Sequence, residues 1–593
     1  MFPIIDRIAK LRTIMTANAI DAVIVPSTDP HQSEYPADHW KAREWISGFT
    51  GSAGTVVFTA DEAGLWTDSR YFLQATKELA RTGIKLYKMD TPGEPSIEEW
   101  LLERLMPGDT LSVNGFTASV DLLRGLIKKF KPLGINVDSK LNLVMDIWDH
   151  RPNIPDTPVF EVDEKLAGAS RKEKIQLIRD EMRELGATHC ILTALDEVAW
   201  TLNLRGSDVE FNPVFYSFLI ISWNHVSLYI NPHKITASIG KKLTNDDINI
   251  YLYDDILKWL KDISEDAAII VDPSKTNADI YSHLPRDIKK LERLTPAATL
   301  KARKNSSEIT SIKRTMIQDG VAMVKFFNWL DQNVCLGAVT EMSASDKLAN
   351  IRSESSDYVG ESFAAISGYG GSGAIIHYRS TKTTNKTIGH HGFYLIDSGG
   401  QYMGGTTDIT RTLHFGNPTE REIRDYTLVL KGHIALAMVH FPAGTRGVQL
   451  DVLARKALWA EGLNYGHGTG HGVGWFLNVH EGPQNIRTND NGVVLESGMV
   501  LSNEPGLYRD GEYGIRLENL VLVERAKESE YGLFYKFETL TLAPFLIKCI
   551  DPLLLDPAEK IWLNRYHEIV YNALSSHLSD NERKWLKINT QPI

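Results

Sequence analysis

The first 160 residues alternate between helical and extended patterns of apolar side chains. Apolar residues recur at helical spacing through Ile5, Ile8, Leu11 and Ile14, and a compact apolar run follows at 22–26. This pattern predicts a helix that leads into a strand. Further strands are expected at 56–58, 64–66 and 111–113, with a helix at 71–80. The alternation predicts an α/β domain over residues 1–158.

A proline-rich segment interrupts this order. Residues 151–158 contain three prolines, and proline lacks the amide N–H that a helix requires, so a linker is expected there. The order then repeats, with a helical pattern at 171–185, a strand at 189–192 and a β-rich stretch near 218–221. We predict a second, related α/β domain over 159–304; the alternative is that any α/β domain shows this alternation.

The remainder of the chain begins with a long helical pattern. Apolar residues from Ile312 to Phe327 keep helical spacing after a short, Lys-rich segment at 295–305, which predicts that a third domain starts there. Beyond about residue 548 the pattern turns helical again, with Ile561, Tyr566 and Val570 among the apolar positions. We therefore expect a third domain over 305–548 and a helical C-terminal extension over 549–593 that packs on it.

Composition and charge narrow the class of protein. The 593 residues are 43% hydrophobic and carry a net charge of −11 without a basic stripe, which is typical of a globular protein and argues against nucleic acid as a partner. Three cysteines without CxxC spacing indicate neither a disulfide framework nor a thiolate zinc site. Because the N-terminus lacks a leader pattern and no long apolar window follows, we expect no membrane segment and a cytoplasmic location.

Two motifs are expected to be misleading. Residues 368–373 satisfy GxGxxG, but 374–378 look like a strand rather than the helix that a dinucleotide site needs. His467 and His471 have the spacing of a helical zinc motif, yet glycine occupies every second position between 466 and 474. Because each glycine would cost about 1 kcal/mol in a helix, a loop or strand edge is expected instead.

Four carboxylates stand at the ends of predicted strands. An apolar strand ends at Asp397, and a second strand begins near Asp408; its period of two places Asp408, Thr410 and Thr412 on one face. About a hundred residues later an apolar run ends at Glu504, and a strand predicted over 513–524 places Arg516 and Glu518 on one face. Two strand pairs, each with two carboxylates, predict a site built between two related half-domains.

Such a cluster requires cations. Carboxylates about 5 Å apart repel one another by about 3 kcal/mol per pair at an effective dielectric constant near 20, and two divalent ions balance four negative charges. With His471 as the one imidazole, the oxygen-rich set favours Mn²⁺, while Zn²⁺ and Co²⁺ stay possible. Two ions that share carboxylates would hold a bridging water whose lowered pKa gives a hydroxide nucleophile.

The order Asp397, Asp408, His471, Glu504, Glu518 resembles the ligand pattern of the pita-bread metallopeptidases, which include methionine aminopeptidase, prolidase and aminopeptidase P. Longer segments are similar to Xaa-Pro aminopeptidases (aminopeptidase P) of the three-domain cytosolic kind. These segments are 373–378, 397–399, 404–412, 467–474, 478–483 and 503–506, with 64–71 as a weaker match before residue 305. The resemblance implies two creatinase-like α/β domains before a pita-bread catalytic domain, a homodimer, and hydrolysis of peptides with proline at the second position.

The resemblance also implies roles for individual residues. Asp397 would bind one metal ion and His471 the other, with Asp408 and Glu518 serving one or both. Glu504 would be a ligand that also takes a proton from the nucleophilic water. Histidines around the substrate would orient the carbonyl and stabilise the oxyanion; they are His377, His467 and His480. Arg516 and Tyr508 are expected to brace the ligands from behind.

Three other readings stay open from the sequence. Prolidase shares the fold and metals but is restricted to dipeptides. The related metal-free amidinohydrolases, typified by creatinase, lack the complete ligand set. Some relatives of the fold are non-catalytic modules that bind peptides or histones; here all five ligand positions are filled, which favours catalysis.

Overall fold

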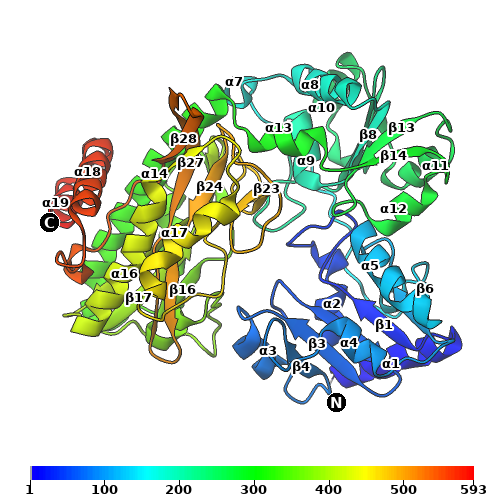
Figure 1. Ribbon diagram of the computed structural model, residues 1–593, viewed down its shortest axis with the longest axis horizontal. Helices are drawn as coiled ribbons and strands as arrows, with labels where there is room; N and C mark the ends of the chain where they lie inside the picture. The colour runs from blue at the N-terminus through cyan, green and yellow to red at the C-terminus, as the bar shows by residue number, and fades with distance from the viewer. Residues whose placement is uncertain (1–2) are drawn as a thin grey trace. The chain divides into compact units, whose positions relative to one another are not determined.

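A computed structural model describes residues 3–593 (Figure 1). The chain folds into two compact units. The first unit contains most of the chain up to Ala297. The second unit contains Ala298–Ile593 together with the short segments Val162–Gly168 and Phe211–Pro213. Within residues 3–593, the helices all fall short of the length and apolar character that crossing a bilayer requires.

The first unit holds two six-stranded sheets of the same topology. The sheet orders are β4-β3-β2-β1-β5-β6 and β12-β11-β10-β8-β13-β14. The central strand of each, β1 or β8, pairs antiparallel with one neighbour and parallel with the other. This identity of order and direction confirms the predicted pair of related α/β domains. The strands are β1 (Ala22–Val25), β2 (Thr55–Thr59), β3 (Ala63–Thr67), β4 (Lys85–Lys88), β5 (Thr110–Val113), β6 (Asn136–Asp138), β8 (His189–Leu192), β10 (Ser217–Ser222), β11 (Val226–Ile230), β12 (Ile248–Tyr251), β13 (Ala268–Val271) and β14 (Lys289–Glu292).

The helices of this unit follow the apolar periodicity. The three predicted from the sequence form as α1 (Pro3–Ala17), α3 (Phe72–Glu78) and α8 (Arg171–Glu184). Helix α8 starts at a capping box in which Ser170 and Glu173 satisfy each other's backbone N–H groups. The proline-rich segment 151–158 has no regular structure, as expected.

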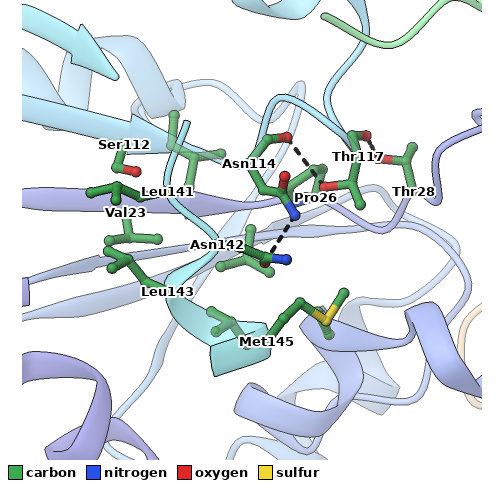
Figure 2. A pocket seen from close by; sticks show the side chains of 14 residues that line it. Val23, Pro26, Thr28, Ser112, Asn114, Thr117, Leu141, Asn142, Leu143 and Met145 are labelled. Atoms are coloured by element: carbon green, nitrogen blue, oxygen red, sulfur yellow. Dashed lines mark hydrogen bonds between the residues drawn. The ribbon is translucent and has the colours of Figure 1, made fainter. Parts of the chain in front are cut away.

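The first unit also contains a small cavity, shown in Figure 2, between β1 and the segment that includes Asn142 and Met145. Its volume of about 20 Å³ has room for about one water molecule. The Asn114 amide donates to Asn142 Oδ1 at 2.9 Å, so these two polar groups at its wall already pair with each other. Because its lining contains no ionisable side chain, this cavity is no candidate for catalysis.

The second unit combines long helices with antiparallel sheets (Figure 1). Helices α14 (Ser306–Asn333) and α15 (Glu341–Arg352) accompany the three-stranded sheet β16 (Ile366–Tyr369), β17 (Gly392–Ser398) and β20 (Ile409–Phe415). Helices α16 (Glu420–Ala437) and α17 (Gly447–Trp459) accompany a six-stranded sheet. In spatial order its strands are β21 (His440–Pro442), β28 (Gly532–Thr539), β27 (Asn519–Ser529), β24 (Val500–Asn503), β22 (Gly470–Gly472) and β23 (Glu481–Ile486).

The boundary segment before this unit is helical. Helix α13 (Pro296–Ala302) occupies most of the Lys-rich stretch at 295–305. Asn305 then caps α14, with its side chain accepting from the backbone N–H of Ser307 and Glu308. The first turn of a helix leaves backbone N–H groups without partners, and the Asn305 side chain supplies them. Asn305 therefore marks the start of α14 and separates it from α13.

The C-terminal residues form helices α18 (Pro557–Leu574) and α19 (Asp580–Asn589), which pack on α14 and α16. Leu563, Tyr566 and Val570 share one buried core with Val324 and Tyr426. The extension is therefore continuous with the core of the second unit.

Arg411 ties this extension to the sheet. Its guanidinium is 1% exposed and donates to the carbonyl oxygens of Thr410, Glu518, Ala543 and Pro544, to Asn519 Oδ1, and to the Tyr566 hydroxyl at 3.1 Å. A rigid fork of five donors suits such a set, whereas the ammonium of lysine cannot reach it.

Two local predictions were wrong. Residues 374–378 do not form a strand, because a 3₁₀ helix covers Gly370–Ala374 and a turn follows. The single strand expected over 513–524 is divided into β26 (Tyr513–Arg516) and β27. The chain changes partners at the break, since the Leu517 amide donates to Pro505 O and the Glu518 amide donates to Thr410 O.

We predict that Arg411→Lys lowers the free energy of unfolding by about 2–4 kcal/mol, because several buried carbonyl oxygens lose their donors. Thermal unfolding of the two proteins checks this. Arg421→Lys, at a side chain that is 53% exposed, is the matched control and should change stability by less than about 0.5 kcal/mol. Equal melting temperatures for Arg411→Lys and the unmodified protein would contradict the role given to Arg411.

Candidate metal centre

The first two carboxylates stand at the paired ends of β17 and β20. Asp397 lies opposite Thr410 in the antiparallel register, and Asp408 directly precedes β20. Both aspartates are buried, at 7% and 4% exposure. Strand pairing therefore brings them to one edge, as the period of two predicted.

The second two carboxylates repeat this arrangement on β24 and β27. Asn503 lies opposite Asn519, so Glu504 and Glu518 are the next residues outward on the two strands. The Glu504 amide donates to Thr469 O at 2.8 Å, and Glu518 Oε2 accepts from Thr410 Oγ1 at 2.8 Å. Thr410 thus joins the two strand pairs, at the place where the four carboxylates meet.

His471 lies on β22, which pairs with β24. Its Nδ1 donates to Gly472 O at 2.9 Å. Burial lowers the pKa of His471, but the hydrogen bond to Asp408 and the charge of Glu504 outweigh it and raise the pKa to about 9, so Nε2 keeps its proton in the metal-free protein. Nε2 lies 3.3 Å from Asp408 Oδ2 and 3.7 Å from Glu504 Oε1. The loop before it is not helical, because the backbone passes from an irregular segment directly into β22. The prediction made from the glycine spacing is confirmed.

The cluster carries more negative charge than its own cations balance. Burial raises the pKa of Asp397, and Asp408 adds to the shift while Arg516 opposes it. Burial likewise raises the pKa of Glu504 to about 7 and that of Glu518 well above its ordinary value. Within residues 3–593, Asp397 Oδ1 has no hydrogen-bond partner although it is buried.

These residues fit divalent metal ions. Atoms of Asp408, His471 and Glu518 that can bind a metal lie within 4.8 Å of one another. Four carboxylates with one imidazole are the ligand types that Mn²⁺ and similar ions accept. The unsatisfied oxygen of Asp397 and the raised carboxylate pKa values are the features that bound cations would relieve.

Arg516 and Tyr508 stand behind the ligands in one hydrogen-bonded chain. Arg516 donates to Asp397 Oδ2 at 2.6 Å and to the Tyr508 hydroxyl at 2.7 Å. The Tyr508 hydroxyl lies 2.8 Å from His467 Nε2, and His467 Nδ1 lies 2.8 Å from Gly468 O. The Tyr508 hydroxyl thus links Arg516 to the His467 ring.

The three predicted histidines all lie near this cluster. His467 Nδ1 is 4.0 Å from Glu504 Oε2. His480 packs edge to face against His471 with ring centroids 4.4 Å apart. His377 occupies the turn after the 3₁₀ helix, next to Ile376, whose carbonyl lies 3.5 Å from Arg516 Nη2.

Sequence reasoning missed a group that holds the His467–His471 segment. Arg455 on α17 donates to the carbonyl oxygens of Tyr465 and His467, both at 2.8 Å, and pairs with Asp451. Asp451 also accepts from Thr469 Oγ1 at 2.6 Å. The i, i+4 spacing of Asp451 and Arg455 was visible in the sequence, but it is also typical of solvated helix faces.

A second missed group fixes the segment after His480. Glu481 is buried and pairs with Lys301 Nζ at 2.7 Å and with Lys304. Both lysines belong to the segment around α13, nearly two hundred residues earlier in the chain. Because both lysines contact this one buried carboxylate, the segment after His480 is held against the segment around α13.

Family models match successive parts of the chain. Residues 310–525 match metallopeptidase family M24, and 533–593 match its C-terminal region. Residues 7–141 and 150–308 each match a creatinase/prolidase N-terminal domain. A probable Xaa-Pro aminopeptidase P of Laccaria bicolor is 40% identical over 99% of this chain and 93% of its own length. Xaa-Pro aminopeptidase 1 of Dictyostelium discoideum is 39% identical over 99% of this chain and 96% of its own.

A solved structure covers the whole chain. X-prolyl aminopeptidase of Caenorhabditis elegans, described as a cytosolic enzyme with a di-nuclear active site, superimposes with a TM-score of 0.96 at 34% identity over 100% of both chains. The fold is thus that of a multidomain pita-bread metallopeptidase, a hydrolase. Within that class, the chain belongs to the Xaa-Pro aminopeptidase family.

We predict that the metal-free protein loses stability as the pH rises from about 4.5 to about 7. The pKa of Glu504 is raised from 4.5 to about 7 in the folded protein. Between these two values the native state binds more protons than the unfolded state, so the free energy of unfolding falls as the pH rises. Bound divalent ions keep the carboxylates ionised and remove this dependence.

Thermal unfolding with Mn²⁺ or with a chelator, at several pH values in that window, measures the effect. The difference between the two melting temperatures should widen as the pH rises. A difference that stays constant or narrows would contradict the charge balance described for the cluster.

Proposed function

We propose that this protein removes the N-terminal residue from peptides whose second residue is proline, using two divalent metal ions. The observation that carries the proposal is the convergence of four carboxylates, three of them buried, and His471 in a chain from the Xaa-Pro aminopeptidase family. Proline specificity rests on the relatives, because the geometry by itself supports a dinuclear hydrolase.

The metal ions would be held by Asp397, Asp408, His471, Glu504 and Glu518, with Mn²⁺ as the ion we favour over Zn²⁺ or Co²⁺. When bound, such ions would make a nearby water more acidic and polarise the scissile carbonyl. The remaining chemistry belongs to the side chains of the chain itself.

Glu504 would take the proton of the attacking water and pass it to the leaving proline nitrogen. Its backbone is fixed through Thr469 O, and Oε1 lies 3.3 Å from Ser502 Oγ. These contacts hold the carboxylate at the edge of the cluster, with 18% of the side chain exposed. A proton acceptor needs this combination of fixed position and access to the substrate.

The histidines would act on the substrate carbonyl. His377, His467 and His480 come from three separate segments that meet around the cluster. A donor at each position can orient the carbonyl and stabilise the oxyanion as charge develops. The hydrogen bonds through Arg516 and Tyr508 would hold His467, which faces the substrate, at a fixed position relative to Asp397, a proposed metal ligand.

A bond before proline requires a dedicated enzyme. It is a tertiary amide without an N–H, and its two isomers differ by only about 1 kcal/mol. Peptidases that bind their substrates through backbone hydrogen bonds lose that contact at proline.

We predict that the protein with Mn²⁺ cleaves an Arg-Pro-Pro peptide and that an Arg-Ala-Pro peptide of the same length is a poor substrate. The measurement is the release of free arginine from each peptide with Mn²⁺, Zn²⁺ and Co²⁺ in parallel. Equal rates on the two peptides would contradict the proline specificity. Activity confined to an Xaa-Pro dipeptide would favour prolidase instead.

We predict that Glu504→Gln lowers kcat by about 10²–10⁴-fold, because the amide cannot accept the proton. The variant should keep the melting temperature of the unmodified protein to within a few degrees, since glutamine has nearly the same shape. The matched control is Glu530→Gln in an exposed loop, which should leave kcat unchanged.

An unchanged kcat for Glu504→Gln with Mn²⁺ would contradict the role of Glu504. No activity in the unmodified protein on any Xaa-Pro peptide, together with binding of the same peptides, would favour a non-catalytic module.

Two further properties are proposed from the relatives. The Caenorhabditis elegans enzyme is described as cytosolic, and we propose the same location for this protein. We also propose a homodimer, which light scattering on the purified protein would test.

A further inference from the structure

A second group of metal-binding side chains lies at the other end of β17 and β20. His391 directly precedes β17, His414 lies near the end of β20, and Glu422 lies in the first turn of α16. One ligand atom from each is within 4.8 Å of the other two. Gly392 pairs with Phe415 at this end of the strands, five residue pairs away from Asp397 and Thr410. The group is therefore separate from the carboxylate cluster.

His414 is the unusual member of this group. Its side chain is fully buried, yet within residues 3–593 neither Nδ1 nor Nε2 has a hydrogen-bond partner. Buried polar atoms in folded proteins are nearly always paired, and an unpaired one costs about 1–3 kcal/mol. Burial lowers the pKa of His414, although Glu422 opposes the shift. A lowered pKa favours the neutral ring, which is the form that binds metals.

The geometry around His414 matches a shared ion. His414 Nε2 lies 3.5 Å from Glu422 Oε2. Two ligands bound to one tetrahedral Zn²⁺ at about 2.0–2.1 Å are separated by about 3.3 Å, so these atoms need to move very little. The rings of His391 and His414 meet edge to face at 5.2 Å, which brings the second imidazole to the same place.

The surroundings hold Glu422 and leave access to His391. Glu422 Oε2 accepts from the Thr419 amide and hydroxyl in the capping box of α16, at 2.7 and 2.8 Å. Gly416 lies against His391: a Cβ atom added to Gly416 would be 2.9 Å from His391 Nδ1. The nearby cation, Lys548, donates to Gly416 O at 3.2 Å. His391 is exposed, so one side of the group is open to solvent.

We propose that His391, His414 and Glu422 form a third divalent-metal site that takes Zn²⁺ or a similar borderline ion. Two imidazoles and one carboxylate, with an open position toward water, are a ligand set that proteins use for zinc. An ion there would join the start of β17, the end of β20 and the first turn of α16. The site stands independently of the proposed peptidase function.

The test separates this site from the dinuclear centre. In full-length protein carrying Asp408→Asn and His471→Asn, the centre loses two ligands. We expect equilibrium dialysis against Zn²⁺, followed by elemental analysis, to find about one equivalent per chain still bound. Adding His391→Ala should remove that equivalent, and Glu422→Gln should weaken its binding at least tenfold. His390→Ala, at the adjacent exposed histidine, is the matched control and should retain the ion.

The same comparison in the unmodified background guards against a folding defect in the double variant. There His391→Ala should lower the bound Zn²⁺ by about one equivalent relative to His390→Ala, with the peptidase activity unchanged. Equal Zn²⁺ content in these two variants would overturn the proposal. So would a double variant that folds and binds no Zn²⁺.

Discussion

The mutual repulsion of four clustered carboxylates, three of them buried, is the constraint on which the second unit depends. Asp397, Asp408, Glu504 and Glu518 converge only because two antiparallel strand pairs end at the same place. Arg516 offsets part of the charge through Asp397, and the rest calls for bound cations. Affinity for divalent ions is thus a consequence of how the strands are paired, and the site and the sheets cannot be altered separately.

Several other side chains around the carboxylate cluster hold the backbone in position. Thr410 joins the two strand pairs through Glu518, and Arg455 holds the carbonyl oxygens that flank His467. Lys301 and Lys304 clamp the residue that follows His480. These contacts are buried, so the backbone around the carboxylate cluster and the histidines is held in place by the protein itself. Preorganisation of this kind reduces the rearrangement needed during catalysis.

The strand-end carboxylates could be predicted because a period of two and a strand boundary are local properties of the sequence. The paired α/β domains were also predictable, since each repeats the same order of apolar runs. The division between β26 and β27 was not, because the apolar pattern continues through Leu517 while the hydrogen-bond partner changes. Ion pairs such as Lys301–Glu481 join distant segments, and no local pattern marks them. The ligand roles of the five residues remain predictions.

Arg411 connects the C-terminal extension to the buried strands beside the carboxylate cluster. One guanidinium holds the backbone of Glu518 on one side and the chain at Ala543 and Pro544 on the other. A truncation that removed Tyr566 and its helix would leave a buried cation short of partners directly behind a carboxylate of the centre. Over evolution, the last fifty residues are therefore expected to change in step with β20, and to resist exchange as an independent module between members of the family.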